Sequence, residues 1–266
     1  MEIEWLFDRG SIKTPSTEQG YSPSLEHKLR DSTCNFICDL VLKLRMPQIT
    51  STTAMIYFNR FFMTHAMQDH DRFLVAASCV YLASKATECP VKLMAFTEQT
   101  VILIDSCQEK SQMPHAAEIE HVKCKIRQYE VILLNTLSYN LVVANPFALV
   151  QLKIDGIQCI INMPVDEIRG LAWAFASDAL KSTIGVQFTM DEIAAGSVYL
   201  SYVFHRIPKS TLTDDGKPWW SVLGPTQEDL DHVCNAIMAT YASTRKRSSS
   251  AFQWLFDNYP TSMNIN

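Results

Sequence analysis

The sequence predicts an all-α protein made of two helical domains, and three observations support this prediction. Glycine makes up only 8 of the 266 residues, and none lies between Tyr21 and Asp155. A sheet of that length would need glycine at its hairpins and bulges. Prolines divide the chain into segments of helical length. Within these segments, apolar residues recur at the spacing of three and four residues that marks one face of a helix.

The first three predicted helices occupy the chain up to about residue 86. The first lies between Pro23 and Pro47, and the second, after Thr50, has a wide aromatic face. Asp71 is placed to cap the third helix, residues 72–86, which is apolar nearly all round. Such a helix is buried on all sides, and its small residues allow neighbouring helices to approach closely.

Two further helices complete the first half. The fourth starts at about Lys92, and the fifth follows Pro114. The fifth has the most regular apolar stripe of the chain, formed by Ile119, Val122, Ile126, Tyr129, Leu133 and Leu137. Asn145 and Pro146 then fit the N-cap and the first position of a new helix.

A short internal repeat indicates a second domain. Residues 76–84 align without gaps on residues 194–202, with five of nine positions identical at an offset of 118, about the size of a small domain. Asp191 precedes the second copy much as Asp71 precedes the first. We therefore expect a buried central helix in each half, at Ala76–Ala83 and at Ala194–Ser201. The predicted divisions are residues 1–23, 24–143, 144–244 and 245–266.

Composition excludes several classes of function. The net charge of −5 disfavours a sequence-independent nucleic-acid binder, which needs a basic face. The longest apolar run, Ile193–Phe204, is about half of the ~20 residues that span a membrane, and the acidic start has no basic region typical of a secretory signal. The eight cysteines form no Cys-x-x-Cys pair. They predict buried free thiols in a reducing compartment, the cytoplasm or nucleus.

No catalytic motif is recognisable. The chain lacks the phosphate-binding loop, Gly-x-Ser-x-Gly and His-Glu-x-x-His patterns. Glu118-x-x-His121 and Asp229-x-x-His232 are weak matches to a di-metal site of a helical oxidase, which is the enzyme alternative. We interpret both as exposed polar faces, and the His65 and His70 pair as too small a ligand set. The sequence thus predicts no enzyme, no metal and no cofactor.

Four segments resemble the cyclin box. They are Phe58–Phe62, Leu74–Ala77, Tyr81–Pro90 and Tyr129–Leu141. Trp5 and Phe7 are similar to an N-terminal Trp-x-Phe of the family, and residues 213–220 resemble a Thr-Asp-Gly-Lys-x-Trp-Trp signature. Among the cyclins the chain most resembles the transcription-type cyclin T subfamily, with cyclin K as the nearest sister.

This resemblance implies a tandem pair of five-helix cyclin-box domains with N-terminal and C-terminal extensions. It also implies a regulatory subunit that pairs with a cyclin-dependent kinase in a heterodimer and activates it. For the cyclin T type, that kinase acts on the tail of RNA polymerase II and promotes transcription elongation, as in positive transcription elongation factor b. The expected location is the nucleus, with no direct contact to nucleic acid or membrane.

The resemblance also assigns residues. Polar and apolar contacts to the kinase are expected from Lys85, Thr87, Glu88, Glu130, Leu134 and Leu141. Structural roles are expected for Trp5, Phe7, Arg30, Arg60, Trp219 and Trp220. Independently of the family, Lys85 closes the third helix and Glu130 lies at the edge of the apolar stripe of the fifth.

Departures and alternatives remain. The Asp that precedes Arg-Phe in cell-cycle cyclins is Asn59 here, so the sequence offers no Asp to pair with Arg30. Cyclins of type K or L are alternatives within the family. A general transcription factor of the IIB type, which binds DNA through two cyclin-like repeats, is the alternative outside it. Residues 245–247, Arg-Lys-Arg, are either a nuclear address or a solubilising end.

Overall fold

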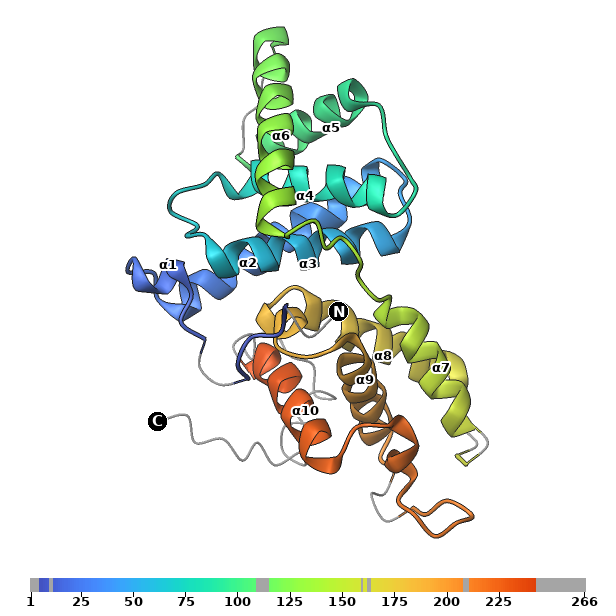
Figure 1. Cartoon of the computed structure of the whole chain (residues 1–266). Helices are drawn as coiled ribbons and strands as arrows, with labels where there is room; N and C mark the ends of the chain where they lie inside the picture. Colours follow the sequence, from blue (N-terminus) through green and yellow to red (C-terminus); the bar gives the residue numbers. More distant parts are fainter. Residues whose placement is uncertain are drawn as a thin grey trace. The chain divides into compact units, whose positions relative to one another are not determined.

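The computed structural model describes residues 5–9, 12–108, 115–158, 160–161, 164–207 and 211–242, and these are helical throughout their regular parts (Figure 1). Within this described part, the only β-type pairing is an isolated bridge between Leu212 and Pro218. The chain forms two compact units: unit 1 is residues 1–143 with 180–186, and unit 2 is residues 144–179 with 187–266. The predicted all-α class is confirmed.

Among its described residues, unit 1 contains five long α-helices, the short helix α1 and the 3₁₀ helix η2. They are α1 (Pro15–Glu18), α2 (Pro23–Lys43), α3 (Gln48–Thr64), α4 (Arg72–Ala86), α5 (Leu93–Cys107), α6 (Ala116–Thr136) and η2 (Thr183–Val186). Each of the five predicted helices is present. Pro47 lies directly before α3, where its fixed φ and missing N–H favour a helix start. Residues 180–186 belong to this unit although they are distant in sequence.

Helix α4 is the centre of unit 1, as the sequence predicts. Every residue from Val75 to Ser84 is buried, and α4 contacts α2, α3, α5 and α6. Asp71 caps it through its carboxylate, which accepts hydrogen bonds from the backbone N–H groups of Phe73 at 2.9 Å and Leu74 at 3.2 Å. The small side chains of α4 let four helices approach it, which a larger residue would prevent.

Helix α6 turns part of its predicted stripe towards the core. Val122, Ile126 and Leu133 are buried, and Leu137 is buried directly after the helix. Tyr129 is only half-buried, at the edge of the same stripe. The opposite side of α6 therefore remains free to present other side chains.

Unit 2 contains, in its described part, four α-helices and the 3₁₀ helix η3. They are α7 (Pro146–Gln158), α8 (Val165–Leu180), α9 (Met190–Phe204), η3 (Trp219–Leu223) and α10 (Gln227–Ala242). Asn145 caps α7, since its side-chain oxygen accepts a hydrogen bond from the N–H of Phe147 at 3.0 Å. The C-terminal segment 245–266, with Arg245–Arg247, lies outside the described residues.

Helix α9 is the buried centre of unit 2, as the repeat predicts. Residues 193–203 are all buried. A Cβ on Gly196 would lie 2.7 Å from Cγ1 of Val233, so only glycine permits the close approach of α10. The likeness of Asp191 to Asp71 does not extend to capping: Thr189 caps α9 in a capping box with Glu192.

The cysteines follow the prediction in part. Cys34, Cys79 and Cys234 are buried free thiols, but the described residues also include exposed free thiols at Cys107 and Cys124. Burial raises the pKa of the Cys79 thiol well above its ordinary value, so this thiol stays protonated and unreactive.

Candidate functional site

An ion pair joins the end of α4 to the middle of α6. Nζ of Lys85 lies 2.5 Å from Oε1 of Glu130, and the two side chains are 44% and 17% exposed. The Lys85 ammonium also lies 4.3 Å from the centre of the Tyr81 ring. Because α4 and α6 pack against each other, two residues far apart in sequence lie on one surface. The sequence predicted both positions but not this direct pairing.

The turn after α4 holds Glu88 in a left-handed conformation. Its φ is 58°, and the Cys89 N–H closes the turn with a 2.8 Å bond to the Ser84 carbonyl. A non-glycine residue in this region costs roughly 1 kcal/mol, so the neighbouring bonds must hold it. The Thr87 hydroxyl donates to the Ala83 carbonyl at 2.9 Å, which leaves the Thr50 hydroxyl to donate to Thr87 at 2.8 Å.

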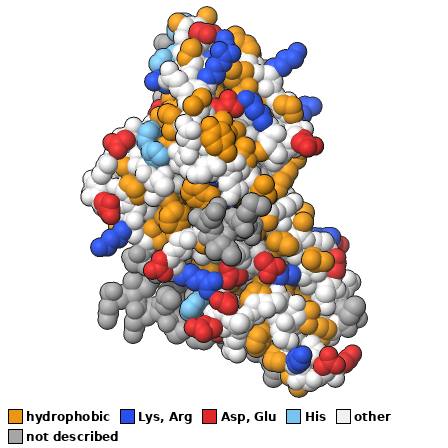
Figure 2. Space-filling view, viewed as in Figure 1, with side chains coloured by type: hydrophobic (Ala, Val, Ile, Leu, Met, Phe, Trp, Pro, Cys, Tyr) orange, Lys and Arg blue, Asp and Glu red, His pale blue; other side chains and the backbone are white. Residues whose placement is uncertain are grey.

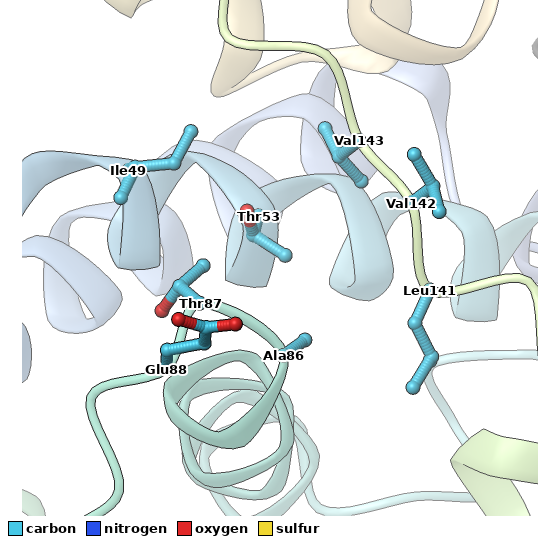
Figure 3. A pocket seen from close by; sticks show the side chains of 8 residues that line it. All are labelled: Ile49, Thr53, Ala86, Thr87, Glu88, Leu141, Val142 and Val143. Carbon is cyan, nitrogen blue, oxygen red and sulfur yellow. The ribbon is translucent and has the colours of Figure 1, made fainter.

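An apolar pocket of about 470 Å³ opens beside this turn. Its lining residues come from the start of α3, the end of α4 and the extended chain after α6 (Figure 3). They are Ile49, Thr53, Ala86, Thr87, Glu88, Leu141, Val142 and Val143. Figure 3 shows the carboxylate of Glu88 beside the side chain of Thr87, at the end of α4. The pocket can thus accept an apolar side chain with a charged group next to it.

The chain after α6 is held in place by Tyr57. Its hydroxyl donates a 2.6 Å hydrogen bond to the Leu141 carbonyl, and burial raises the pKa of Tyr57 above its ordinary value. The phenol therefore remains a donor at neutral pH. Ser138 and Tyr139 form the connecting turn with φ values of 50° and 59°. Leu134 is half-buried on α6, four residues after Glu130 and hence on the same face.

Sequence reasoning missed several residues of this surface. Ile49, Thr53 and Val143 line the pocket, and no periodic pattern marks them. Val142 lines it too and is 74% exposed, while Val131 on α6 is 58% exposed. The signal available in the sequence was the run of apolar residues 141–143 directly before the capped helix at Asn145.

Arg30 lies in a buried polar network that the sequence did not predict. It is 1% exposed, and its guanidinium binds the Glu26 carboxylate at 2.6 Å, one turn earlier in α2. Asn59, in place of the absent Asp, accepts from Arg30 at 3.0 Å and donates to the Leu180 carbonyl at 3.0 Å. Glu26 thus supplies the buried negative charge, and Asn59 links α3 to the 180–186 segment within unit 1.

The N-terminal residues pack on unit 1. The guanidinium carbon of Arg60 lies 5.3 Å from the centre of the Trp5 ring, a cation–π arrangement. The Phe7 N–H donates a 2.8 Å hydrogen bond to the carbonyl of Val186, the last residue of η2. Arg60 itself is buried in α3.

The Trp-Trp pair of unit 2 divides its roles. Trp219 is fully buried and stacks on Tyr199 with ring centres 5.5 Å apart. Trp220 is only half-buried. The segment before them makes a tight turn at Gly216, which has a φ of 73°. Trp219 is therefore a core residue of unit 2.

Other candidate sites gain no support within the described residues. No group of three or more His, Cys, Asp or Glu side chains there could hold a metal ion. His65 and His70 do lie together, with ring centres 5.3 Å apart, but without a third ligand of these types. Glu118 and His121 lie on α6, whereas Asp229 and His232 lie on α10 of the other unit. No described helix is both long enough and apolar enough to cross a bilayer.

Unit 1, with an apolar pocket next to a partly exposed ion pair, has the features of a protein-binding module. The chain belongs to the cyclin family, because residues 5–142 match the family model "Cyclin, N-terminal domain". Cyclins are regulatory subunits of kinases and are not themselves enzymes.

Curated relatives are transcription-type cyclins. Cyclin-T1-5 of Arabidopsis thaliana is 30% identical over 92% of this chain and 42% of its own length. Cyclin-T1-3 of Oryza sativa is 31% identical over 91% of this chain and 49% of its own length. Cyclin-L1 of Gallus gallus is 28% identical over 88% of this chain and 42% of its own length. The chain thus spans about half of these relatives or less.

Solved structures share the fold. A chain of the yeast RNA polymerase II CTD kinase CTDK-1 complex matches with a TM-score of 0.71 and 18% identity, over 91% of this chain and 73% of that one. A chain of the CAK complex of Chaetomium thermophilum matches with a TM-score of 0.58 and 14% identity, over 90% and 69%. At these identities the likeness is one of fold.

Proposed function

We propose that this chain is the cyclin subunit that binds and activates a cyclin-dependent serine/threonine kinase in the nucleus. The proposed kinase phosphorylates the tail of RNA polymerase II, in the manner of positive transcription elongation factor b. Supporting this are the cyclin T and cyclin L relatives and the likeness to a chain of a kinase complex for that tail. The observation that carries the proposal is the Lys85–Glu130 pair beside the apolar pocket.

The ion pair has hydrogen-bonding capacity left for a partner. An ammonium has three N–H donors and a carboxylate has two acceptor oxygens, and the pair uses one bond between Nζ of Lys85 and Oε1 of Glu130. A docked kinase segment can therefore offer a backbone carbonyl to Lys85 and a backbone N–H to Glu130. Such bonds fix the register of the partner more than they add affinity.

Apolar contacts supply most of the affinity at such a surface. The pocket between Ile49, Leu141 and Val142 is large enough for an aliphatic side chain, and Val131 and Leu134 extend the apolar area along α6. The carboxylate of Glu88 at the rim favours a basic residue next to the inserted side chain.

The chain then acts by selecting a state of the kinase. It binds the conformation in which the mobile helix of the kinase brings a Glu into the Lys–Glu ion pair that orders the phosphate site. To move a kinase from 1:99 to 99:1 in favour of this state, the cyclin must bind it about 10⁴-fold more tightly than the inactive state. No catalytic residue of this chain is needed.

A cyclin of type L is the second candidate within the family, because relatives of that name match over most of the chain. A DNA-binding factor of the IIB type has no comparable support. On the face shown in Figure 2, the coloured Lys and Arg side chains are interspersed with Asp and Glu rather than gathered in a basic stripe. Weak heparin retention with little salt dependence is expected for the cyclin.

The test is to replace the ion pair and to measure kinase activation. Co-purification from a nuclear extract, with identification of the bound kinase, defines the partner. The double variant Lys85→Ala with Glu130→Ala should then weaken binding by about 30-fold to several-thousand-fold and abolish activation, because the backbone carbonyl and N–H that the kinase offers to the pair are left without hydrogen-bond partners in the buried interface. The matched control on α6 is Glu118→Ala with His121→Ala.

The control pair lies on the same helix, nine and twelve residues before Glu130, and should leave activation unchanged. Both variants should keep the helicity and melting temperature of the native chain, since the Lys85–Glu130 pair is partly exposed. Activation at the wild-type level in the Lys85 and Glu130 variant would place the functional surface elsewhere.

A further inference from the structure

A short sequence from the N-terminus occurs a second time near the C-terminus. Trp-Leu-Phe-Asp forms residues 5–8 and again residues 254–257. The likeness continues on the N-terminal side, where Ile3-Glu4 precedes the first copy and Phe252-Gln253 precedes the second. Each copy thus has an apolar residue, then Glu or its neutral isostere Gln, before the Trp. Since the chain has only five Trp, this match is not a product of common residues.

The first copy occupies a defined site on unit 1. Trp5, Leu6 and Phe7 are half-buried, and Trp5 lies over the guanidinium of buried Arg60 on α3. The backbone of Phe7 binds the carbonyl at the end of η2, at Val186. The side chains therefore decide which sequence fits, because any residue except proline could make the backbone bond.

The site is held together by a tight contact between α3 and η2. A Cβ on Gly185 would lie 2.7 Å from Cδ1 of Ile56, so glycine is what allows η2 to approach α3 this closely. This approach holds η2, which ends at Val186, against α3, which carries Arg60. A ligand for the site needs an aromatic ring two residues before a free backbone N–H, and Trp-x-Phe provides both.

We propose that residues 254–257 bind the same site as residues 5–8, so that the chain carries two interchangeable ligands for it. The four residues of the two copies are identical, so each can make the same cation–π contact, the same backbone bond and the same half-buried apolar contacts. Both copies are covalently attached to the protein. The occupant is then set by the effective concentration of each copy, which is about millimolar for a motif on a short linker.

Fluorine NMR of the full chain labelled with 5-fluorotryptophan tests this exchange. Replacement of each Trp by Phe in turn assigns the five signals. In the Trp5→Ala variant, the site is open, and the Trp254 signal should move from its wild-type position. The matched control is Trp220→Ala, which removes another half-buried Trp but leaves the site filled, so the Trp254 signal should stay. A Trp254 signal that is unchanged in Trp5→Ala overturns the proposal.

A second measurement uses the wild-type chain and does not depend on how the Trp5→Ala variant folds. A synthetic peptide of residues 252–258 is added up to concentrations above about 1 mM, the range of a tethered competitor. The Trp5 signal should shift as the peptide displaces residues 5–8. A peptide with Ala in place of Trp should need about 30-fold more to do so, because it lacks the aromatic anchor. If the two peptides act alike, or if neither moves the Trp5 signal, the two copies do not share a site.

Discussion

The buried charge of Arg30 provides a quantitative test of the fold of unit 1. Its guanidinium is within 3.0 Å of Oε1 of Glu26, Oδ1 of Asn59 and the carbonyl of Phe62. Glu26 is the only carboxylate among these three acceptors, and Thr14 supports it by donating a 2.5 Å hydrogen bond to its second oxygen. The substitution Glu26→Gln keeps the shape of the side chain and removes its charge.

The expected cost follows from what remains around Arg30. Arginine stays protonated in proteins, so the variant keeps a buried cation with only neutral acceptors. Removing one partner of a buried ion pair costs about 3–5 kcal/mol. Because the amide oxygen of Gln can still accept one bond and Asn59 still accepts another, we expect the lower end, about 3 kcal/mol.

Urea denaturation followed by circular dichroism measures this change in the free energy of unfolding. The matched control is Glu120→Gln, which breaks a surface ion pair with Lys123 at 2.8 Å on α6. Surface pairs contribute about 0–1 kcal/mol, so the control should shift the transition little. The double variant Glu26→Gln with Arg30→Met should recover part of the loss, since no buried cation remains. If Glu26→Gln is no more destabilising than the control, Glu26 does not neutralise the buried charge of Arg30.

Three further predictions concern packing and pH. Ala77→Leu and Ala195→Leu should each destabilise the protein by about 1–3 kcal/mol in the same assay, because both sites are fully buried in the central helices. Neutral effects at both sites would mean that these helices are not central. Gly196→Ala should lower the free energy of unfolding, because the added Cβ would lie against Val233. In the control Gly170→Ala the added Cβ meets no atom within 4 Å, so the free energy of unfolding should rise by about 0.5–1 kcal/mol through helix propensity. Equal effects of the two substitutions would refute the close approach at α9. Desolvation, and then the neighbouring His65, lower the pKa of His70. The imidazole of His70 therefore takes up a proton at a higher pH in the unfolded chain than in the folded one. The free energy of unfolding should fall as the pH drops below about 6.5, the pKa of the unfolded state. His70→Gln should flatten this slope, and an unchanged slope would assign the dependence to other groups.

Much of the helical framework was predictable because its causes are local. The sparse glycine, the proline positions and the apolar spacing predicted the helices of unit 1, and Asp71 predicted the start of α4. The small-residue repeat predicted the two buried helices, since a segment without a polar face has no side for solvent. At α9 the sequence pointed to Asp191, whereas in the structure Thr189 caps the helix.

The candidate site was predictable only in pieces. The position of Lys85 at a helix end and of Glu130 beside an apolar stripe came from periodicity, and their roles came from the cyclin resemblance. The pocket was not predictable, because Ile49, Thr53 and Val143 come from segments with no shared pattern. The strained turns at Glu88 and Tyr139 were also missed, since nothing in the residue types marks a positive φ there.

The sequence by itself determined where the long helices of unit 1 lie, which helix of each unit is buried at its centre and which family the chain resembles. These properties depend on spacing along the chain and on residue type, which are local quantities. Only the tertiary structure decided that Lys85 pairs with Glu130, that Glu26 rather than Asn59 supplies the negative charge to Arg30, and that Trp5 lies over Arg60. Each of these contacts depends on how helices distant in sequence pack, and a buried or paired charge is stable only where that packing brings its partner within hydrogen-bonding distance.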